Sequence, residues 1–403
     1  MKLFSRQEKA LLALLAFMQF SHIVDFMIMM PLGPQLMRMF EITPKQFGLL
    51  VSSYTFAASL SGFLAAFFVD RFDRKKTVLF FYSGFALATL LCALSPNYYS
   101  LLVTRAMTGA FGGILGSLIF AIVGDSIEAA RRGSAMGIVM GAFSIASIFG
   151  VPFSLYLANT FSWHAPFFFL GLVSLLIVGV AGKQLPAVNA HLQKGMKHDS
   201  PVQTLFRVAT DSNQLLALCF LFLLVMGQFT VIPFMSPSFV ANGGLSEAQL
   251  PLIYLFGGVV SMVTSPLVGR AADKYGKKRV FTIGALGSII PLYLITNMGP
   301  SSVYYLIPVS CLFFLGMGAR MVPAMSMVTS TVKMQYRGSF MSLSSSTQQM
   351  SAAFASFIAG LIVVKSETGT LENYDIVGYI AIIGTILAVL AARMMKSVEA
   401  HGE

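Results

Sequence analysis

The chain consists of long runs of apolar residues that are separated by short polar segments. Each run has about 20 residues or more, enough for a helix to cross the ~30 Å hydrocarbon core of a bilayer. A membrane β-barrel would show alternating segments of about ten residues instead, and these runs do not alternate. We therefore predict an all-α membrane protein with twelve transmembrane helices, at residues 9–30, 44–69, 75–95, 98–124, 133–158, 163–185, 214–240, 247–269, 277–298, 302–328, 338–364 and 374–396.

The two halves of the sequence resemble each other. The order of apolar, acidic and basic positions in residues 61–81 recurs in residues 264–284, about half a chain length later. Such an internal repeat is typical of chains that are built from two similar membrane bundles. We predict two pseudo-symmetric six-helix bundles, at 1–185 and 214–403, which a polar, proline-containing linker at 186–213 joins on the cytoplasmic side.

Charge placement indicates how the chain lies in the membrane. The formal net charge of +11 would also suit a nucleic-acid partner. With the N-terminus inside, however, 22 of the 27 Lys and Arg residues fall on the inner side, and only Arg38, Lys45 and Lys365 fall outside. This asymmetry follows the positive-inside rule. We expect a multi-pass protein of the inner (cytoplasmic) membrane, with both termini in the cytoplasm and no nucleic-acid partner.

Several kinds of site are not expected. Cys92, Cys219 and Cys311 all fall within predicted spans and have no disulfide or metal spacing. No G-x-x-x-x-G-K-[ST] string occurs, which argues against ATP as the energy source. We predict no metal site and no cofactor.

Two loops carry a recognisable motif. Residues 66–76 (AFFVDRFDRKK) and 269–279 (GRAADKYGKKR) follow the second and eighth predicted helices. Both are similar to the G-x-x-x-D-R-x-G-R-R motif of the major facilitator superfamily, although Ala66 and Asp73 replace glycines in the first copy. Residues 101–109 and 161–167 also resemble this family, in particular its drug:proton antiporter branch and the sugar-efflux-like relatives. The resemblance implies the major facilitator fold and transport by alternating access.

The repeated motif predicts a conformational latch on the inner side. A carboxylate at a helix N-terminus is stabilised by free N–H groups and the helix dipole, so Asp70 should face the start of the eleventh helix and Asp273 the start of the fifth. Simple anchoring of both loops at lipid headgroups is the alternative. The predicted latch residues are Asp70, Arg71, Arg74, Asp273, Lys274, Arg132 and Arg337.

Asp25 is the carboxyl group that we place in mid-membrane. Ionisable groups there are costly and usually serve the passage of an ion or a substrate. His22 lies one helical turn earlier and can share a proton, while the family resemblance implies that Arg105 takes part in proton coupling. We predict proton coupling by Asp25, His22 and Arg105, with a structural salt bridge between Asp25 and Arg105 as the alternative. The repeat mate of Asp25 is Gln228, which cannot titrate.

Other polar and aromatic residues in the spans are candidates for a substrate cavity, because lipid disfavours exposed polar groups. Ordinary helix packing is the alternative for the aromatic residues, and closure of the inner gate is the alternative for Arg320. The predicted cavity residues are Gln19, Tyr54, Phe143, Gln228, Tyr254, Arg320, Gln348 and Gln349.

These features favour a secondary active transporter over an enzyme. We expect proton-coupled efflux (antiport) of a small, partly apolar organic compound, with the substrate, protons and the lipid bilayer as partners of a monomer. Proton-coupled uptake of a sugar or an organic anion is one alternative. A non-transporting membrane sensor or a membrane enzyme is another, although His164 has no nearby carboxylate in the sequence to form a catalytic site.

Overall fold

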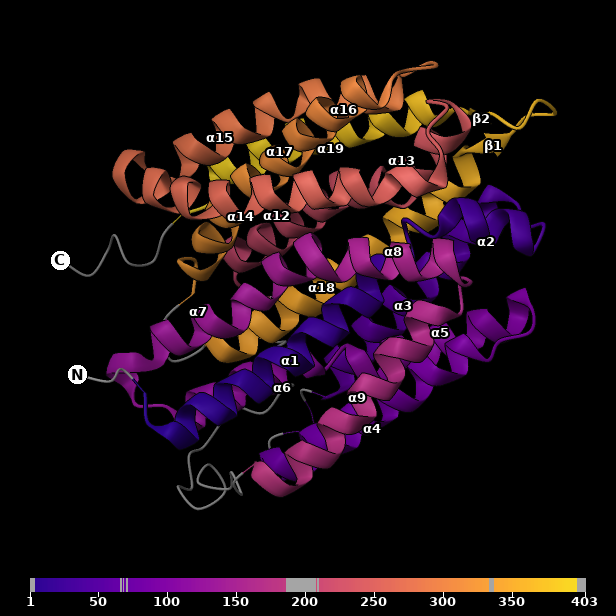
Figure 1. Ribbon diagram of the computed structural model, residues 1–403. Helices are drawn as coiled ribbons and strands as arrows, with labels where there is room; N and C mark the ends of the chain where they lie inside the picture. Colours follow the sequence, from indigo (N-terminus) through magenta and orange to yellow (C-terminus); the bar gives the residue numbers. More distant parts are fainter. Residues whose placement is uncertain are drawn as a thin grey trace.

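The computed structural model describes residues 4–185 except 66, 68, 70 and 71, and residues 208–396 except 209 and 333–336. Long helices run side by side through the molecule, with one short antiparallel strand pair at one end (Figure 1). The first group comprises α1 (Arg6–Ile28), α2 (Gly33–Met39), α3 (Pro44–Ala65), α4 (Arg74–Ala93), α5 (Tyr98–Gly112), α6 (Leu115–Ser126), α7 (Ala129–Ile145), the π-helical turn η2 (Ala146–Gly150), α8 (Val151–Thr160) and α9 (Ala165–Gln184).

The second group follows the predicted linker, most of which lies outside the described residues. It comprises α12 (Ser212–Phe229), α13 (Ile232–Ala241), η3 (Glu247–Gln249), α14 (Leu250–Tyr275), α15 (Lys277–Gly287), α16 (Ile289–Thr296), α17 (Val303–Thr329), α18 (Arg337–Ile362), strands β1 (Val364–Lys365) and β2 (Leu371–Glu372), and α19 (Tyr374–Met394). We refer to the described residues up to 185 as the N-half and to those from 208 onward as the C-half. Most helices of each half pack on helices of the same half.

The predicted spans agree with the helices. Within the described ranges, eleven helical segments are long and apolar enough to cross a membrane, and they fall on eleven of the twelve predicted spans. The twelfth prediction falls on α18, which has 26 residues but is rich in serine, threonine and glutamine. This helix packs against α3 of the N-half and α12 of the C-half. A polar helix is stable in a membrane only when other helices shield it from lipid.

The two ends of the molecule differ (Figure 1). We call the end that carries the start of α1 and the end of α19 the terminal end, and the opposite end, with α2, α13 and the two strands, the hairpin end. At the hairpin end, α2 meets α13 and α8 meets α14. At the terminal end, the start of α7 and the end of α14 diverge (Figure 1), whereas the two helices contact each other farther along.

A polar clasp joins the halves at the hairpin end. Arg38 of α2 forms an ion pair with Glu247 of η3. Asn159 of α8 donates a hydrogen bond to the Glu247 carbonyl oxygen (3.1 Å) and accepts one from Gln35 of α2 (2.6 Å). Between described residues, the other hydrogen bond that crosses the halves is donated by Ser59 to the Ser346 carbonyl oxygen. The structure is therefore closed at the hairpin end.

Small residues allow two helices of the N-half to approach very closely. A Cβ atom on Gly109 of α5 would lie 2.1 Å from the carbonyl oxygen of Tyr54 in α3, and one on Gly113 would lie 2.3 Å from that of Ala58. Such stripes of small residues allow membrane helices to pack backbone against backbone. The packing fixes the position of Tyr54 of α3 relative to α5.

We predict that Gly109→Ala destabilises the protein, because the new methyl group cannot fit beside the Tyr54 backbone. Overpacking of this kind typically costs about 1–3 kcal/mol, which a thermal unfolding measurement in detergent would show as a lower melting temperature. Gly116→Ala in α6 is the matched control, since nothing lies within 4 Å of a Cβ there. The control should be neutral or slightly stabilising. Equal shifts in both variants would contradict the close packing of α3 and α5.

Candidate functional site

The most distinctive group in the described residues is an ion pair that lies deep in the N-half. Nη1 of Arg105 lies 2.8 Å from Oδ2 of Asp25, and the two side chains are 1% and 0% exposed. Arg105 Nη2 also donates to the Asp25 carbonyl oxygen (3.4 Å) and Thr89 Oγ1 to Asp25 Oδ1 (3.3 Å). Three helices, α1, α4 and α5, thus provide the pair and its hydrogen bonds. Removal of one partner would leave an uncompensated charge in the core.

The sequence analysis left two roles open for Asp25, which are proton coupling and a structural salt bridge. The expected contact between Asp25 and Arg105 is present, so the salt-bridge alternative describes this conformation. The Asp25 side chain is 0% exposed in this conformation, and proton coupling by Asp25 stays a prediction. Asp25 lies inside the N-half rather than on a surface between the halves.

Tyr54 and His22 form a second layer around the pair. The Arg105 guanidinium carbon lies 4.6 Å from the centre of the Tyr54 ring, within the range of a cation–π contact. The Tyr54 hydroxyl and His22 Nε2 share a hydrogen bond of 3.0 Å. His22 Nδ1 is buried and has no hydrogen-bond partner among the described residues. All three residues predicted for proton coupling therefore lie in one cluster, with Tyr54 between His22 and Arg105.

The remaining predicted cavity residues do not form one group. Buried polar atoms of Gln19 (Oε1), Gln228 (Nε2) and Arg320 (Nε) lack hydrogen-bond partners in the described part of the chain. Such atoms are costly, at about 1–3 kcal/mol each, and water or a ligand can satisfy them. Gln348 donates to the Ser344 carbonyl oxygen (3.4 Å), and Gln349 is partly buried.

Three cavity candidates lie away from the ion pair. Arg320 is 1% exposed and donates to Thr385 of α19 (3.0 Å), so it belongs to the interior of the C-half. Tyr254 is 5% exposed, and its hydroxyl bonds Ser236 (2.8 Å). Phe143 on α7 is 50% exposed. The packing alternative thus describes Tyr254 in this conformation.

The ion pair has no charged counterpart in the C-half. Gln228 occupies the position equivalent to Asp25. The N-cap of α5 is Asn97, and the N-cap of α17, the equivalent helix in the repeat, is Ser302. When these two caps are aligned, Arg105 matches Ser310. The buried Ser310 hydroxyl has no partner within the described ranges. The repeat therefore keeps polar side chains at both positions but retains charge in the N-half alone.

Four of the predicted latch residues, Arg74, Arg132, Asp273 and Lys274, have described side chains. Asp70 and Arg71 lie outside the described residues, as does the side chain of Arg337. Arg74 pairs with Asp125 (3.3 Å), and Arg132 donates to the Ile127 carbonyl oxygen (3.5 Å), both within the N-half.

The second copy of the motif, in the C-half, is described. Asp273 and Lys274 are exposed, and Asp273 helps to line a pocket of about 630 Å³ with basic residues of its own half, Lys277, Lys278, Arg279 and Lys396. Asp273 makes no hydrogen bond or ion pair with α7 among the described residues. The latch remains a prediction.

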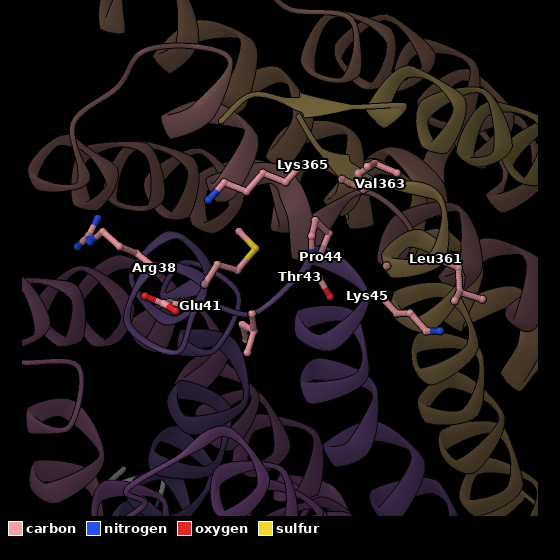
Figure 2. A pocket seen from close by; sticks show the side chains of 12 residues that line it. Arg38, Glu41, Thr43, Pro44, Lys45, Leu361, Val363 and Lys365 are labelled. Atoms are coloured by element: carbon pink, nitrogen blue, oxygen red, sulfur yellow. The ribbon is translucent and has the colours of Figure 1, made fainter. Parts of the chain in front are cut away.

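A pocket of about 560 Å³ opens at the hairpin end (Figure 2). Its walls come from residues 37–45 of the N-half and 360–365 of the C-half, so relative movement of the halves must change its shape. Its lining includes Arg38, Lys45 and Lys365, the three cations that the charge analysis places outside. Figure 2 shows that Lys45 points away from the other two. None of the predicted cavity residues lines this pocket.

Comparison with known proteins identifies the family. The family model described as Major Facilitator Superfamily matches residues 15–269 and 217–402. The chain is similar to the MFS-type transporter YceJ of Bacillus subtilis (strain 168), with 26% identity over 348 residues that cover 85% of this chain and 86% of that protein. It is also similar to a probable sugar efflux transporter of Helicobacter pylori, with 25% identity over 239 residues that cover 59% and 60% of the two chains.

A solved structure shows the same fold. It is a bacterial homologue of the human lysosomal transporter Spinster in an inward-facing, unoccupied conformation, which matches with a TM-score of 0.76 at 14% identity over 97% of this chain and 98% of that one. The sequence matches, the membrane-spanning helices and this fold agree with one another. The chain therefore belongs to the Major Facilitator Superfamily, and it is a multi-pass membrane transporter rather than an enzyme.

Proposed function

We propose that this transporter exports a small, partly apolar organic compound in exchange for protons. The observation that supports this most directly is the Asp25–Arg105 pair, which is fully buried in one half and has neutral residues at the equivalent positions of the other. A charge pair is a costly way to stabilise a membrane core, since apolar residues of the same volume often do as well. A group that gains and loses a proton during the cycle accounts for that cost.

The proposed cycle uses the two halves as moving units. The bundles at 1–185 and 214–403 would turn relative to each other, with the segment 186–213 as the flexible connection. The charge asymmetry supports a cytoplasmic terminal end, with the protein in the inner membrane. The conformation that is closed at the hairpin end would then be the one that takes up substrate from the cytoplasm.

In the proposed coupling step, a proton neutralises Asp25 and weakens its bond to Arg105. The ion pair and the separated pair are two discrete arrangements, and both the proton and the substrate can bias the equilibrium between them. His22 is suited to deliver the proton, because it lies one turn from Asp25 and touches Tyr54. The unpartnered atoms of Gln19 and of Gln228 are candidates for contact with the substrate.

The direction of transport can be tested in liposomes that contain the purified protein and a pH-sensitive dye in the lumen. A panel of sugars is the first probe, because one relative is named as a sugar efflux transporter, and amphipathic dyes are the second. When a substrate is added outside without a pH gradient, antiport should make the lumen more alkaline as protons leave. Acidification would instead support the alternative of proton-coupled uptake. Entry of the compound into the lumen without a pH change would rule out proton coupling for that compound.

We predict that Asp25→Asn abolishes transport driven by a pH gradient but retains substrate binding, because the amide keeps the shape and cannot titrate. The variant should also lose about 3–5 kcal/mol of stability, since Arg105 becomes an unpaired buried charge. The double variant Asp25→Asn with Arg105→Gln should recover much of that stability without recovering coupled transport. Both properties can be measured in one preparation, by thermal unfolding and by flux.

Glu8→Gln provides the matched control for Asp25→Asn. Glu8 lies on the same helix and pairs with Arg131 at 2.9 Å, but these side chains are 20% and 31% exposed. Loss of such a pair should cost less than about 1 kcal/mol and leave coupled transport intact. Full gradient-driven transport by Asp25→Asn would show that the proton binds elsewhere, with His22 as the next candidate.

We further predict that Glu247→Gln favours opening at the hairpin end. The Arg38–Glu247 pair is partly exposed (63% and 18%), so its loss should change the ratio of open to closed molecules by no more than about fivefold. Spin labels at Tyr99 and Tyr304, which are 72% and 86% exposed at the two sides of this end, can report the distance. Lys45→Gln, which removes a nearby cation without an ion-pair partner in the described chain, should have no such effect. A larger shift in Lys45→Gln than in Glu247→Gln would contradict the clasp.

A further inference from the structure

Tyr54 lies between the buried ion pair and the contact that joins the two halves. Its ring is 1% exposed, with the Arg105 guanidinium 4.6 Å from one side. On another side the ring lies 5.4 Å from that of Phe26, tilted by 35°. Phe26 in turn lies 6.0 Å from Phe229 of the C-half. Aromatic rings at these separations are in contact, so one continuous row of side chains runs from Arg105 to the C-half.

The contact at the end of this row has a special position in the repeat. Phe26 follows Asp25 directly, and Phe229 follows Gln228, the repeat mate of Asp25. The two phenylalanines are therefore themselves repeat mates, and they meet across the boundary between the halves. In a pseudo-twofold arrangement, equivalent residues contact each other only near the symmetry axis. A small displacement of Phe26 thus acts at the centre of the interface.

Tyr54 is held so that it cannot absorb a movement of Arg105 locally. Its carbonyl oxygen would lie 2.1 Å from a Cβ on Gly109, which shows how tightly its backbone abuts α5. Its hydroxyl bonds His22 Nε2 at 3.0 Å. Close-packed interiors transmit displacement rather than dissipate it.

We propose that Tyr54 is a positioning residue that transmits the state of the Asp25–Arg105 pair to the Phe26–Phe229 contact between the halves. When Asp25 is neutralised, Arg105 loses its charge partner. It keeps its bond to the Asp25 carbonyl oxygen (3.4 Å) and its contacts with the faces of Tyr54 and of Phe167, 5.9 Å away. A shift of the guanidinium toward the Tyr54 ring then presses on Phe26. This inference rests on the proposed function, because it takes Asp25 as the group that changes charge.

The titratable groups that surround Tyr54 come from three helices. They are Asp25 and His22 on α1, Cys92 on α4 and Arg105 on α5. Cys92 bonds the Thr108 hydroxyl through sulfur (3.5 Å) and is 0% exposed. A response to protonation that passes through Tyr54 must therefore begin at one of these four groups, and Asp25 is the one in direct contact with Arg105.

The experiment measures how Asp25 and Tyr54 depend on each other. Spin labels are placed at Tyr99 and Tyr304 in full-length protein from which the accessible Cys219 and Cys311 have been changed to serine. The ratio of open to closed hairpin ends is measured with Asp25 and with Asp25→Asn, in each of three backgrounds: Tyr54, Tyr54→Phe and Tyr54→Leu. Phenylalanine keeps the ring and loses the hydroxyl, whereas leucine removes the ring.

We expect Asp25→Asn to change the ratio about tenfold when Tyr54 or Tyr54→Phe is present, a typical size for coupling between sites. In Tyr54→Leu the same change should be less than about twofold. A full response in Tyr54→Leu would overturn the role of Tyr54 and leave the proposed function standing. No response in any background would overturn both, because Asp25 would then not control the movement of the halves.

Two further measurements serve as an alternative and a control for this test. If Asp25→Asn does not fold, a transfer from alkaline to acidic buffer replaces the substitution, with the same outcomes expected in the same three backgrounds. Tyr82→Leu is the matched control, since Tyr82 is another fully buried tyrosine of the N-half that bonds Ser21 (2.7 Å) and stacks on Phe85. It should leave the response to Asp25 unchanged, and loss of the response there would overturn the specific role of Tyr54.

Discussion

The structure depends on one constraint, which is that a carboxylate in the middle of a membrane protein needs a partner. Asp25 and Arg105 satisfy each other at 2.8 Å, and Thr89 supplies a further bond to the carboxylate. Three helices must therefore keep a fixed relative position for as long as the pair exists. The close approach of α3 to α5 at Gly109 adds a fourth helix to this group. The N-half is rigid around the same residues that we propose to change charge, so a change at Asp25 acts on the whole bundle.

The two halves of the repeat differ in their chemistry. Gln228 and Ser310 replace the charged pair in the C-half, and Arg320 occupies a different place, where it bonds Thr385. A neutral amide and a hydroxyl can be rearranged at lower cost than an ion pair in a low-dielectric interior. This asymmetry is suited to a division of roles, in which one half responds to protons and the other adapts to the transported compound.

The sequence predicts the helices of this protein better than it predicts their facing surfaces. Spans are evident because each must satisfy its own backbone hydrogen bonds within an apolar run. Asp25 and Arg105 are conspicuous because charged side chains are rare within such runs. The side to which these two side chains point could not be predicted. Helices that are apolar on all sides carry no periodic signal that separates the interior of a half from the surface between halves. The contacts of Phe26 and Thr89 could not be predicted from the sequence, because such residues are common in membrane helices.

The low apolarity of α18 has a consequence for how the protein is made. A segment rich in serine, threonine and glutamine partitions poorly from water into lipid by itself. Its two main neighbours, α3 and α12, are both synthesised before it, and each can offer a shielded surface to its polar side. Insertion of α18 is therefore assisted by helices that are already in the bilayer, one from each half.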